Sequence, residues 1–205
     1  MKYTTFKRML DFLLSLAAII VLSPVFIVLV CVIKMESEGP VIFRQKRVGI
    51  DKKFFSILKF RTMRIDTPKD VPTHLMQNPE QYITKAGQFM RKTSLDELPQ
   101  LFNILKGDMS IVGPRPALWN QDDLIAARDS LGVNAILPGL TGLAQVKGRD
   151  ELPIPIKAKY DGEYVQKMSF WFDCKIIFLT IRAVAASEGV KEGGCYEEQK
   201  SINNG

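Results

Sequence analysis

The feature that most constrains this chain is an uninterrupted apolar run near its N-terminus. Residues Phe12 to Ile33 read FLLSLAAIIVLSPVFIVLVCVI, which is 22 residues without a charge, between Asp11 and Lys34. A straight helix of that length is about 33 Å long, enough to cross a bilayer. A cleaved signal peptide would have a shorter apolar core followed by a small-residue cleavage site, and neither is present. The run is therefore expected to stay in the mature protein as a membrane segment.

Ser23 and Pro24 lie at the middle of this run and leave two arrangements open. Proline removes a helical hydrogen bond and disfavours helix at the residue before it. Each half would then measure about 16 Å, which reaches only mid-bilayer. Cationic residues flank both ends, which favours a re-entrant helix-break-helix with both ends in the cytoplasm over a single kinked crossing. These residues are Lys2, Lys7 and Arg8 before the run, and Lys34, Arg44, Lys46, Arg47, Lys52 and Lys53 after it.

Composition and charge indicate a folded, membrane-associated chain. Hydrophobic residues make up 46% of the 205 residues and charged residues 24%, which is enough apolar content for a core. The net charge of +6 is concentrated in residues 1–65, where 12 Lys and Arg face 4 acids. That region suits an anionic membrane surface or a phosphate ligand, and no nucleic-acid-binding motif accompanies it. Three widely spaced cysteines and a single histidine, His74, indicate neither a disulfide framework nor a zinc site.

The rest of the chain predicts a mixed α/β, mainly helical fold. A membrane hairpin over 1–36 is expected to precede a compact catalytic domain over 37–187, with a mobile tail over 188–205. Glycines at 139, 142 and 148 predict tight turns and close backbone approach rather than regular structure, in a loop suited to phosphate. The predicted elements are a small β-hairpin of Val41–Arg44 and Phe54–Phe60, a surface loop over 66–82, a helix over Pro99–Lys106, a strand over Met109–Val112, a helix over Gln121–Ser130 and an amphipathic, interfacial helical region over Ile156–Ala186.

The adjacent acids Asp96 and Glu97 are the strongest candidates for chemistry. They lie just before Pro99, where a helix is expected to start, and helix N-termini favour anions. A purely structural interpretation competes: Ser94 and Glu97 fit the S-x-x-E capping box, in which Glu97 only satisfies a backbone amide. Pro99 conflicts with that box, because a helix starting at Ser94 would hold proline where an amide hydrogen is required. The local sequence leaves both interpretations open.

Two close carboxylates suit phosphoryl chemistry. One can attack phosphorus, while the other holds Mg²⁺ or accepts a proton. Arginines and lysines would neutralise the phosphate oxygens, and Arg115 is the foremost candidate because Pro114 and Pro116 hold it in a stiff loop. The candidate phosphate-binding residues are Lys59, Arg91, Arg115 and Arg149.

Several motifs together resemble one known family. The Ser23-Pro24 hairpin, KFRTM, SLDELPQLFNILKGDMSIVGPRP, PGLTGLAQVKGRD and KYDGEYVQKMSFWFDCKI are similar to the bacterial sugar transferase family, in its small monotopic phosphoglycosyl transferases. The similarity runs from about Lys7 to Ile181. Gly162 and Lys147 depart from the commonest pattern, which leaves local geometry and donor choice open.

The resemblance implies transfer of a sugar 1-phosphate from a UDP-sugar to undecaprenyl phosphate with release of UMP. This would begin a cell-envelope glycan such as an exopolysaccharide, at the cytoplasmic face of the bacterial inner membrane. Asp96 matches the family nucleophile, which forms a covalent phosphosugar ester, and Glu97 matches its partner in a Mg²⁺-dependent pair. A second copy of the chain or downstream glycosyltransferases are the protein partners implied. The competing hypothesis is a membrane-bound lipid-phosphate binding or scaffolding module without turnover. The sequence does not identify the transferred sugar.

Overall fold

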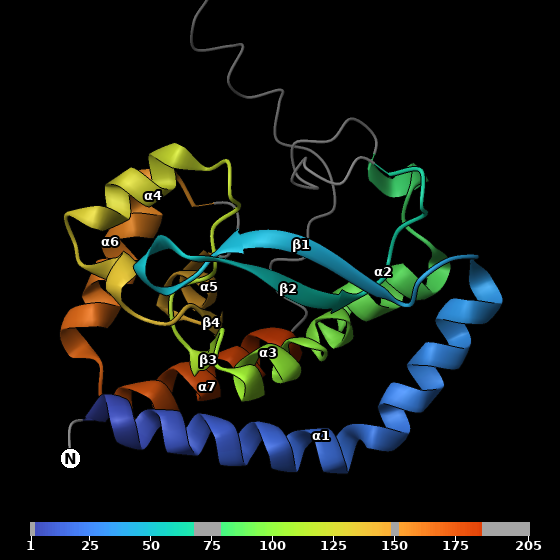
Figure 1. Cartoon of the computed structure of the whole chain (residues 1–205), viewed down its shortest axis with the longest axis horizontal. Helices are drawn as coiled ribbons and strands as arrows, with labels where there is room; N and C mark the ends of the chain where they lie inside the picture. Colours follow the sequence, from blue (N-terminus) through green and yellow to red (C-terminus); the bar gives the residue numbers. More distant parts are fainter. Residues whose placement is uncertain (1–2, 68–78, 149–151, 186–205) are drawn as a thin grey trace, which may run out of the picture.

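A computed structural model of the chain describes residues 3–67, 79–148 and 152–185, and its arrangement is drawn in Figure 1. The fold is mixed α/β and mostly helical, as the sequence predicts. The predicted tail over 188–205 and most of the predicted loop over 66–82 lie outside the described residues. In chain order the elements are α1 Tyr3–Glu36, β1 Ile42–Val48, β2 Phe54–Phe60, α2 Lys85–Lys92, α3 Gln100–Lys106, β3 Ser110–Val112, α4 Asp122–Asp129, β4 Gly139–Thr141, α5 Leu143–Gly148, α6 Ile154–Lys167 and α7 Phe170–Ala185, with short 3-10 turns η1 Ile50–Lys52, η3 Pro79–Gln81, η4 Leu95–Glu97 and η5 Val133–Ala135.

The apolar run forms a single long helix that bends. Helix α1 has 34 residues and continues through Pro24, so the predicted interruption at Ser23 and Pro24 is a bend within one helix. Figure 1 shows α1, in blue, running beneath the molecule and then turning upward toward α2. A proline removes one backbone hydrogen bond, which bends a long helix without ending it. The Ser23 hydroxyl donates to the carbonyl of Ile20 at 2.8 Å, which fits this local adjustment. The re-entrant path through a membrane stays a prediction.

Most of α1 lies open rather than buried. The helix is long and apolar enough to cross a membrane, yet only 11% of its most apolar 18-residue window is buried. A core helix of a soluble domain would be mostly buried, so this surface needs another apolar environment. Its most exposed apolar residues include Leu13, Leu14, Ile20, Val21, Ile27, Val28 and Met35.

Both ends of α1 are held by the rest of the fold. Near the N-terminal end, Arg8 donates to the carbonyl of Ile104 at 2.6 Å, at the end of α3. At the C-terminal end, Glu36 accepts a hydrogen bond from the amide of Ala86 at 3.1 Å, in the first turn of α2. Ile33, also near that end, is buried in one of the hydrophobic clusters of the core. The two ends of the apolar helix therefore contact the same folded body.

The β-hairpin forms as predicted, with a longer first strand. Strands β1 and β2 pair antiparallel from Ile42 opposite Phe60 to Val48 opposite Phe54. On one face of the hairpin, Ile57 is buried in a cluster with Leu101 and Ile104 of α3. This packing places β2 directly beside the helix that follows Asp96 and Glu97.

The glycine-rich segment forms regular structure, contrary to the predicted turns. Gly139 begins β4, which pairs parallel with β3, and Gly148 ends α5. Close backbone approach is the reason for two of these glycines. A Cβ on Gly139 would lie 2.1 Å from the amide nitrogen of Gly113, and one on Gly142 would lie 2.0 Å from the Gly113 carbonyl oxygen. The prediction of close approach is therefore confirmed at Gly139 and Gly142. The prediction of irregular structure is wrong for Gly139 and Gly148, whereas Gly142 does connect β4 to α5 outside both.

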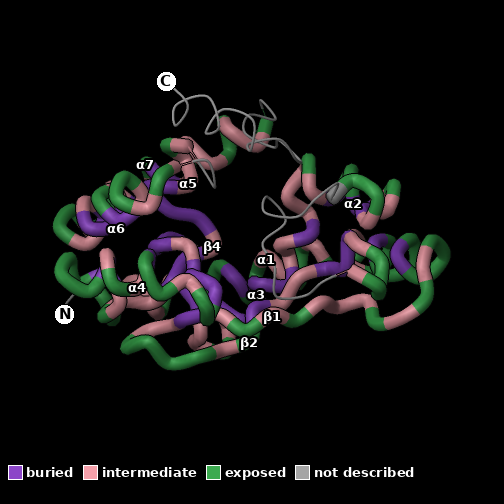
Figure 2. The backbone as a smooth tube through the Cα atoms, turned by 90° about the horizontal axis from the view of Figure 1, so that it is seen from above, coloured by how far each residue is buried: buried purple, intermediate pink, exposed green. Residues whose placement is uncertain are grey.

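The helical region predicted over Ile156–Ala186 is two helices. Met168 is extended, with φ −55° and ψ 113°, which ends α6. Ser169 then starts α7 by accepting a weak hydrogen bond from the amide of Phe172 at 3.4 Å. Serine is a favoured helix-capping residue, so this break was legible in the sequence. Figure 2 shows the buried residues gathered around α3 and β4, inside the surrounding helices.

Candidate active site

Asp96 and Glu97 lie in the turn η4, between α2 and α3. Ser94 precedes this turn in the left-handed conformation, with φ 58° and ψ 18°, and its side chain makes no capping hydrogen bond. The capping box is therefore not formed, and the structural interpretation of Glu97 fails. A left-handed serine is strained, because its Cβ crowds the following carbonyl. In the turn that follows this left-handed residue, Asp96 is buried at 8% exposure and Glu97 is half-buried.

Cations from three separate elements surround the two acids. Lys59 of β2 donates from Nζ to Glu97 Oε1 at 2.7 Å and lies 3.9 Å from Asp96 Oδ2. Arg115, in the loop after β3, reaches the same Glu97 oxygen from Nη2 at 3.2 Å. Arg91, at the end of α2, is close enough to lower the pKa of Asp96. The fold thus brings together four of the five predicted positions around Asp96, and Arg149 lies outside the described residues.

One residue that positions a cation was missed by sequence reasoning. Arg91 donates from Nε to the hydroxyl of Thr62 at 2.9 Å, and Thr62 is buried. The carbonyl of Thr62 accepts from the amide of Thr84, just before α2. Thr62 thereby fixes Arg91 relative to the end of β2. It lies in the KFRTM segment, but no rule of local sequence assigns such a contact.

The two carboxylates differ in their hydrogen bonds and in their pKa. Glu97 is held by Lys59 and Arg115, whereas Asp96 accepts no hydrogen bond from residues 3–67, 79–148 or 152–185. Burial favours the neutral acid at both. At Glu97 the charges of Lys59 and Arg115 outweigh burial and lower the pKa to about 2. At Asp96 burial prevails, reinforced by the adjacent Glu97 charge, and the pKa is raised.

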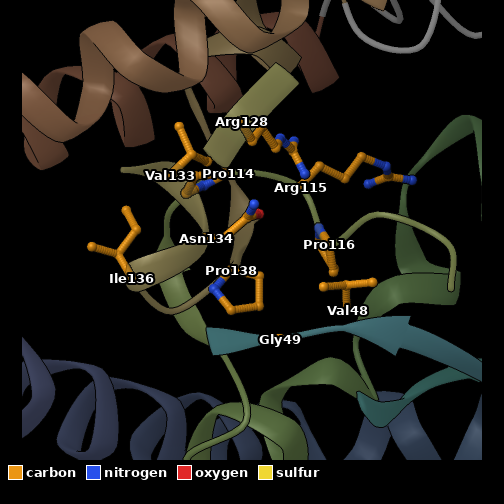
Figure 3. A pocket seen from close by; sticks show the side chains of 10 residues that line it. All are labelled: Val48, Gly49, Pro114, Arg115, Pro116, Arg128, Val133, Asn134, Ile136 and Pro138. Atoms are coloured by element: carbon orange, nitrogen blue, oxygen red, sulfur yellow. The ribbon is translucent and has the colours of Figure 1, made fainter. Parts of the chain in front are cut away.

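The acid pair lines neither of two hollows found among the described residues. A space of about 10 Å³ lies beside the Arg115 loop, and a space of about 160 Å³ lies beneath the N-terminal end of α1. The first has room for about one water molecule. Figure 3 shows that Arg115 extends away from it, on the side opposite Val133 and Ile136. Arg115 thus both lines the hollow and reaches the acid pair through its ion pair with Glu97.

The acid pair fits Mg²⁺ better than a metal that needs a full protein cage. No cluster of three or more His, Cys, Asp or Glu residues occurs among the described residues. Mg²⁺ binds one or two carboxylates and completes its shell with water and substrate phosphates. Neither carboxylate oxygen of Asp96 accepts a hydrogen bond from the described residues, and the described contacts of Glu97 engage Oε1 and leave Oε2. These two residues therefore fit a magnesium ion that a diphosphate helps to hold.

Comparisons with known proteins identify the family of this chain. The bacterial sugar transferase model matches residues 2–187. The UDP-glucose:undecaprenyl-phosphate glucose-1-phosphate transferase of Escherichia coli (strain K12) is 41% identical over 182 residues, which cover 85% of this chain and 39% of that protein. The uncharacterized sugar transferase EpsL of Bacillus subtilis (strain 168) is 38% identical, over 97% of this chain and 96% of that protein. The exopolysaccharide production protein ExoY of Rhizobium meliloti (strain 1021) is 36% identical, over 89% of this chain and 87% of that protein.

Proposed function

Because the chain belongs to the bacterial sugar transferase family, of the phosphoglycosyl transferase type, we propose that it transfers a sugar 1-phosphate from a UDP-sugar to undecaprenyl phosphate. The chain spans only 39% of the length of the Escherichia coli relative, so the substrates of that protein are part of the proposal and not a property carried over. The observation that carries it is the asymmetric acid pair, in which Asp96 is free of described hydrogen bonds and Glu97 is bound by two cations.

Asp96 is the proposed nucleophile. A carboxylate that is not stabilised by hydrogen bonds keeps more of its nucleophilic strength than one that is paired. One oxygen of Asp96 attacks the phosphorus that carries the sugar, and the bond from that phosphorus to the bridging oxygen breaks. UMP leaves with the bridging oxygen and its electron pair. The product on the enzyme is a phosphosugar ester of Asp96.

The second half of the reaction returns Asp96 to its free form. A phosphate oxygen of undecaprenyl phosphate attacks the same phosphorus, and the bond between phosphorus and the Asp96 oxygen breaks. The carboxylate leaves, and the lipid carries the sugar through a new diphosphate. Lys59, Arg91 and Arg115 are placed to offset the negative charge that accumulates on the phosphate oxygens in both halves.

Glu97 is assigned to charge and metal binding rather than to proton transfer. A carboxyl with a pKa of about 2 is a weak base at neutral pH, so it would rarely take up a proton. Together with Asp96 it would hold Mg²⁺, which when bound neutralises charge on the diphosphate. Lys59 and Arg115 keep Glu97 ionised and fixed in direction.

The test is release of UMP by the purified chain with Mg²⁺, undecaprenyl phosphate and a panel of UDP-sugars. At least one donor should give turnover that stops when EDTA removes the metal. A chain that binds undecaprenyl phosphate without metal and turns over no donor in the panel would instead be a lipid-phosphate binding module. The donor that reacts also identifies the sugar.

The membrane path is proposed to be re-entrant, with both ends of α1 at the cytoplasmic face of the bacterial inner membrane. Support comes from Arg8 and Glu36, which tie the two ends of α1 to the same folded body. A helix crossing a bilayer of about 30 Å would carry one end away from that body. Single cysteines at Thr5 and Met35, both exposed, should react with a membrane-impermeant reagent only from the cytoplasmic side. Reaction of T5C from the outer side would establish a crossing.

A further inference from the structure

Gln100, the first residue of α3, holds a buried donor that the fold does not use. The residue is 1% exposed, and its Nε2 has no hydrogen-bond partner among the described residues. Buried amide groups are almost always paired, because an unpaired one loses its water without compensation. The neighbouring amide of Asn103 follows the rule, since it donates to the carbonyl of Ser56 at 2.9 Å and accepts from the amide of Leu58 at 2.9 Å. The unused donor of Gln100 therefore requires an explanation.

The helical path directs Gln100 toward the acid pair. Leu98 and Pro99 both have right-handed helical backbone angles, so the chain stays helical from η4 into α3. Asp96 lies four residues before Gln100 and Glu97 lies three residues before it. Residues at these spacings share one face of a helix, and helical side chains lean toward the preceding turn. These spacings put Gln100 on the helical face that carries Asp96 and Glu97.

The charges around this turn indicate which kind of group would accept a hydrogen bond from Gln100. Lys59, Arg91 and Arg115 surround the acids and attract an anion, while Asp96 accepts no hydrogen bond from any residue that the structure describes. An N–H donor in such a place fits an anionic oxygen of a ligand. The amide is neutral, so it can bind that oxygen without adding a fourth cation to the site.

We propose that the Nε2–H of Gln100 donates a hydrogen bond to an oxygen of the phosphoryl group held at Asp96, so that Gln100 binds the phosphate being transferred. The proposal rests on the function proposed above, because it takes a phosphoryl group at Asp96 as its ligand. It adds to the three cations a neutral donor, on a buried residue at the start of α3.

The first test compares Q100M, Q100E and the control L101M, which places methionine at the next buried position of the same helix. Q100M should lower kcat for UMP release by about 10- to 100-fold, the value of a hydrogen bond to a charged group. Q100E should lower it further, because its carboxylate repels the phosphate. L101M should change kcat less than threefold, since leucine and methionine have similar volumes.

Stability separates this role from a structural one. Q100M removes a buried donor that has no described partner, so its Tm should equal or exceed that of the wild type. A merely structural amide would lower the Tm when replaced. Q100M that unfolds or loses several degrees in Tm, or that keeps full kcat, overturns the proposal.

A second test does not depend on turnover. Binding of inorganic phosphate to the full chain, measured by the rise in Tm with phosphate concentration, should be about 10- to 100-fold weaker in Q100M than in wild type and L101M. If no UDP-sugar is turned over but phosphate binding still depends on Gln100, the proposed function fails and the role of Gln100 stands. If turnover occurs and phosphate affinity is the same in wild type and Q100M, the role of Gln100 fails and the proposed function stands.

Discussion

Two buried aspartates, Asp96 and Asp173, stand in opposite environments within one fold. Asp173, in α7, is 6% exposed and Asp96 is 8% exposed. Asp173 accepts hydrogen bonds from the hydroxyl of Tyr3 at 2.6 Å, from Lys7 Nζ at 2.5 Å and from the hydroxyl of Tyr164 at 2.8 Å. Asp96 accepts none from the described residues. Burial at equal depth thus has two outcomes, one carboxylate that fastens elements together and one left available to a ligand.

The neighbouring donors explain why Asp173 is hydrogen-bonded and Asp96 is not. Lys7 and Tyr3 come from α1, and Tyr164 comes from α6, so Asp173 joins the membrane helix to two helices of the folded body. Burial and the Asp173 charge raise the pKa of the Tyr164 hydroxyl, which keeps it a donor. Lys59 lies 3.9 Å from Asp96 and makes its shorter contact, at 2.7 Å, with Glu97. A satisfied carboxylate stabilises the fold, whereas an unsatisfied one can react.

The largest expected effect is on activity, from D96N. UMP release should fall about a thousandfold or more, because the amide cannot attack phosphorus. The Tm should stay the same or rise. Because burial raises the pKa of Asp96, ionisation of this carboxyl costs folding free energy, and this cost is relieved as the pH falls from the folded pKa toward the unfolded one. UMP assays and thermal unfolding in one detergent check both parts, and a D96N protein with normal turnover contradicts the assignment.

D173N should show the reverse pattern. Asparagine keeps one acceptor oxygen where Asp173 serves three donors, and Lys7 loses its ion partner, so the free energy of unfolding should fall by about 3 kcal/mol. Activity per folded molecule should change only a few-fold. The double variant K7M/D173N should recover part of the lost stability, because it leaves no unpaired buried charge. A D173N protein as stable as wild type would remove the contrast between the two aspartates.

E97Q tests whether Glu97, unlike Asp96, stabilises the fold through its charge. The folded pKa of Glu97, about 2, lies below its unfolded value of 4.5, so its stabilisation of about 3 kcal/mol is fully present above pH 4.5 and is lost as the pH falls through about 2. E97Q should therefore be less stable than wild type at pH 7 and approach it near pH 2. Denaturant unfolding at several pH values measures this, and a stability difference that does not change with pH contradicts the role of Lys59 and Arg115.

The smallest effect comes from the strained residue ahead of the acids. S94G should stabilise the protein by about 0.5–1 kcal/mol, because glycine adopts a positive φ without strain and Ser94 makes no capping bond that would be lost. A functional capping box would instead make S94G slightly destabilising. Chemical denaturation distinguishes the two signs. S94V, which worsens the strain, is the matched opposite and should destabilise the protein.

The contrast between the two aspartates also separates what the sequence could predict from what it could not. Local patterns predicted the β-hairpin, α3 and β3, from a turn between two apolar and basic segments and from Pro99 and Gly107 at the ends of α3. Lys59, Arg91 and Arg115 were predicted only as phosphate-binding candidates, and their place around the acid pair comes from the fold. The network around Asp173 was not predicted, because Tyr3 and Asp173 are 170 residues apart and no local rule pairs them.

The remaining errors have physical causes as well. Strand β4 was missed because three residues are too few to show an alternating pattern, and its parallel pairing with β3 is decided by tertiary contact. The capping box failed because Pro99 and the left-handed Ser94 give the turn another geometry. Helix α1 stayed continuous at Pro24, since a long helix can absorb one lost hydrogen bond by bending.

The measurement that most directly tests the central claim is the mass of the intact protein after incubation with Mg²⁺ and a reactive UDP-sugar in the absence of undecaprenyl phosphate. We expect a gain in mass equal to one sugar phosphate. Trypsin cleaves after Lys92 and after Lys106, so the gain should lie on the peptide Thr93–Lys106, which contains both acids. The gain should persist in E97Q, at a reduced rate, and be absent in D96N. Addition of undecaprenyl phosphate should remove it. A gain in D96N, or turnover by wild type with no gain under conditions that trap the ester, would contradict a nucleophilic Asp96.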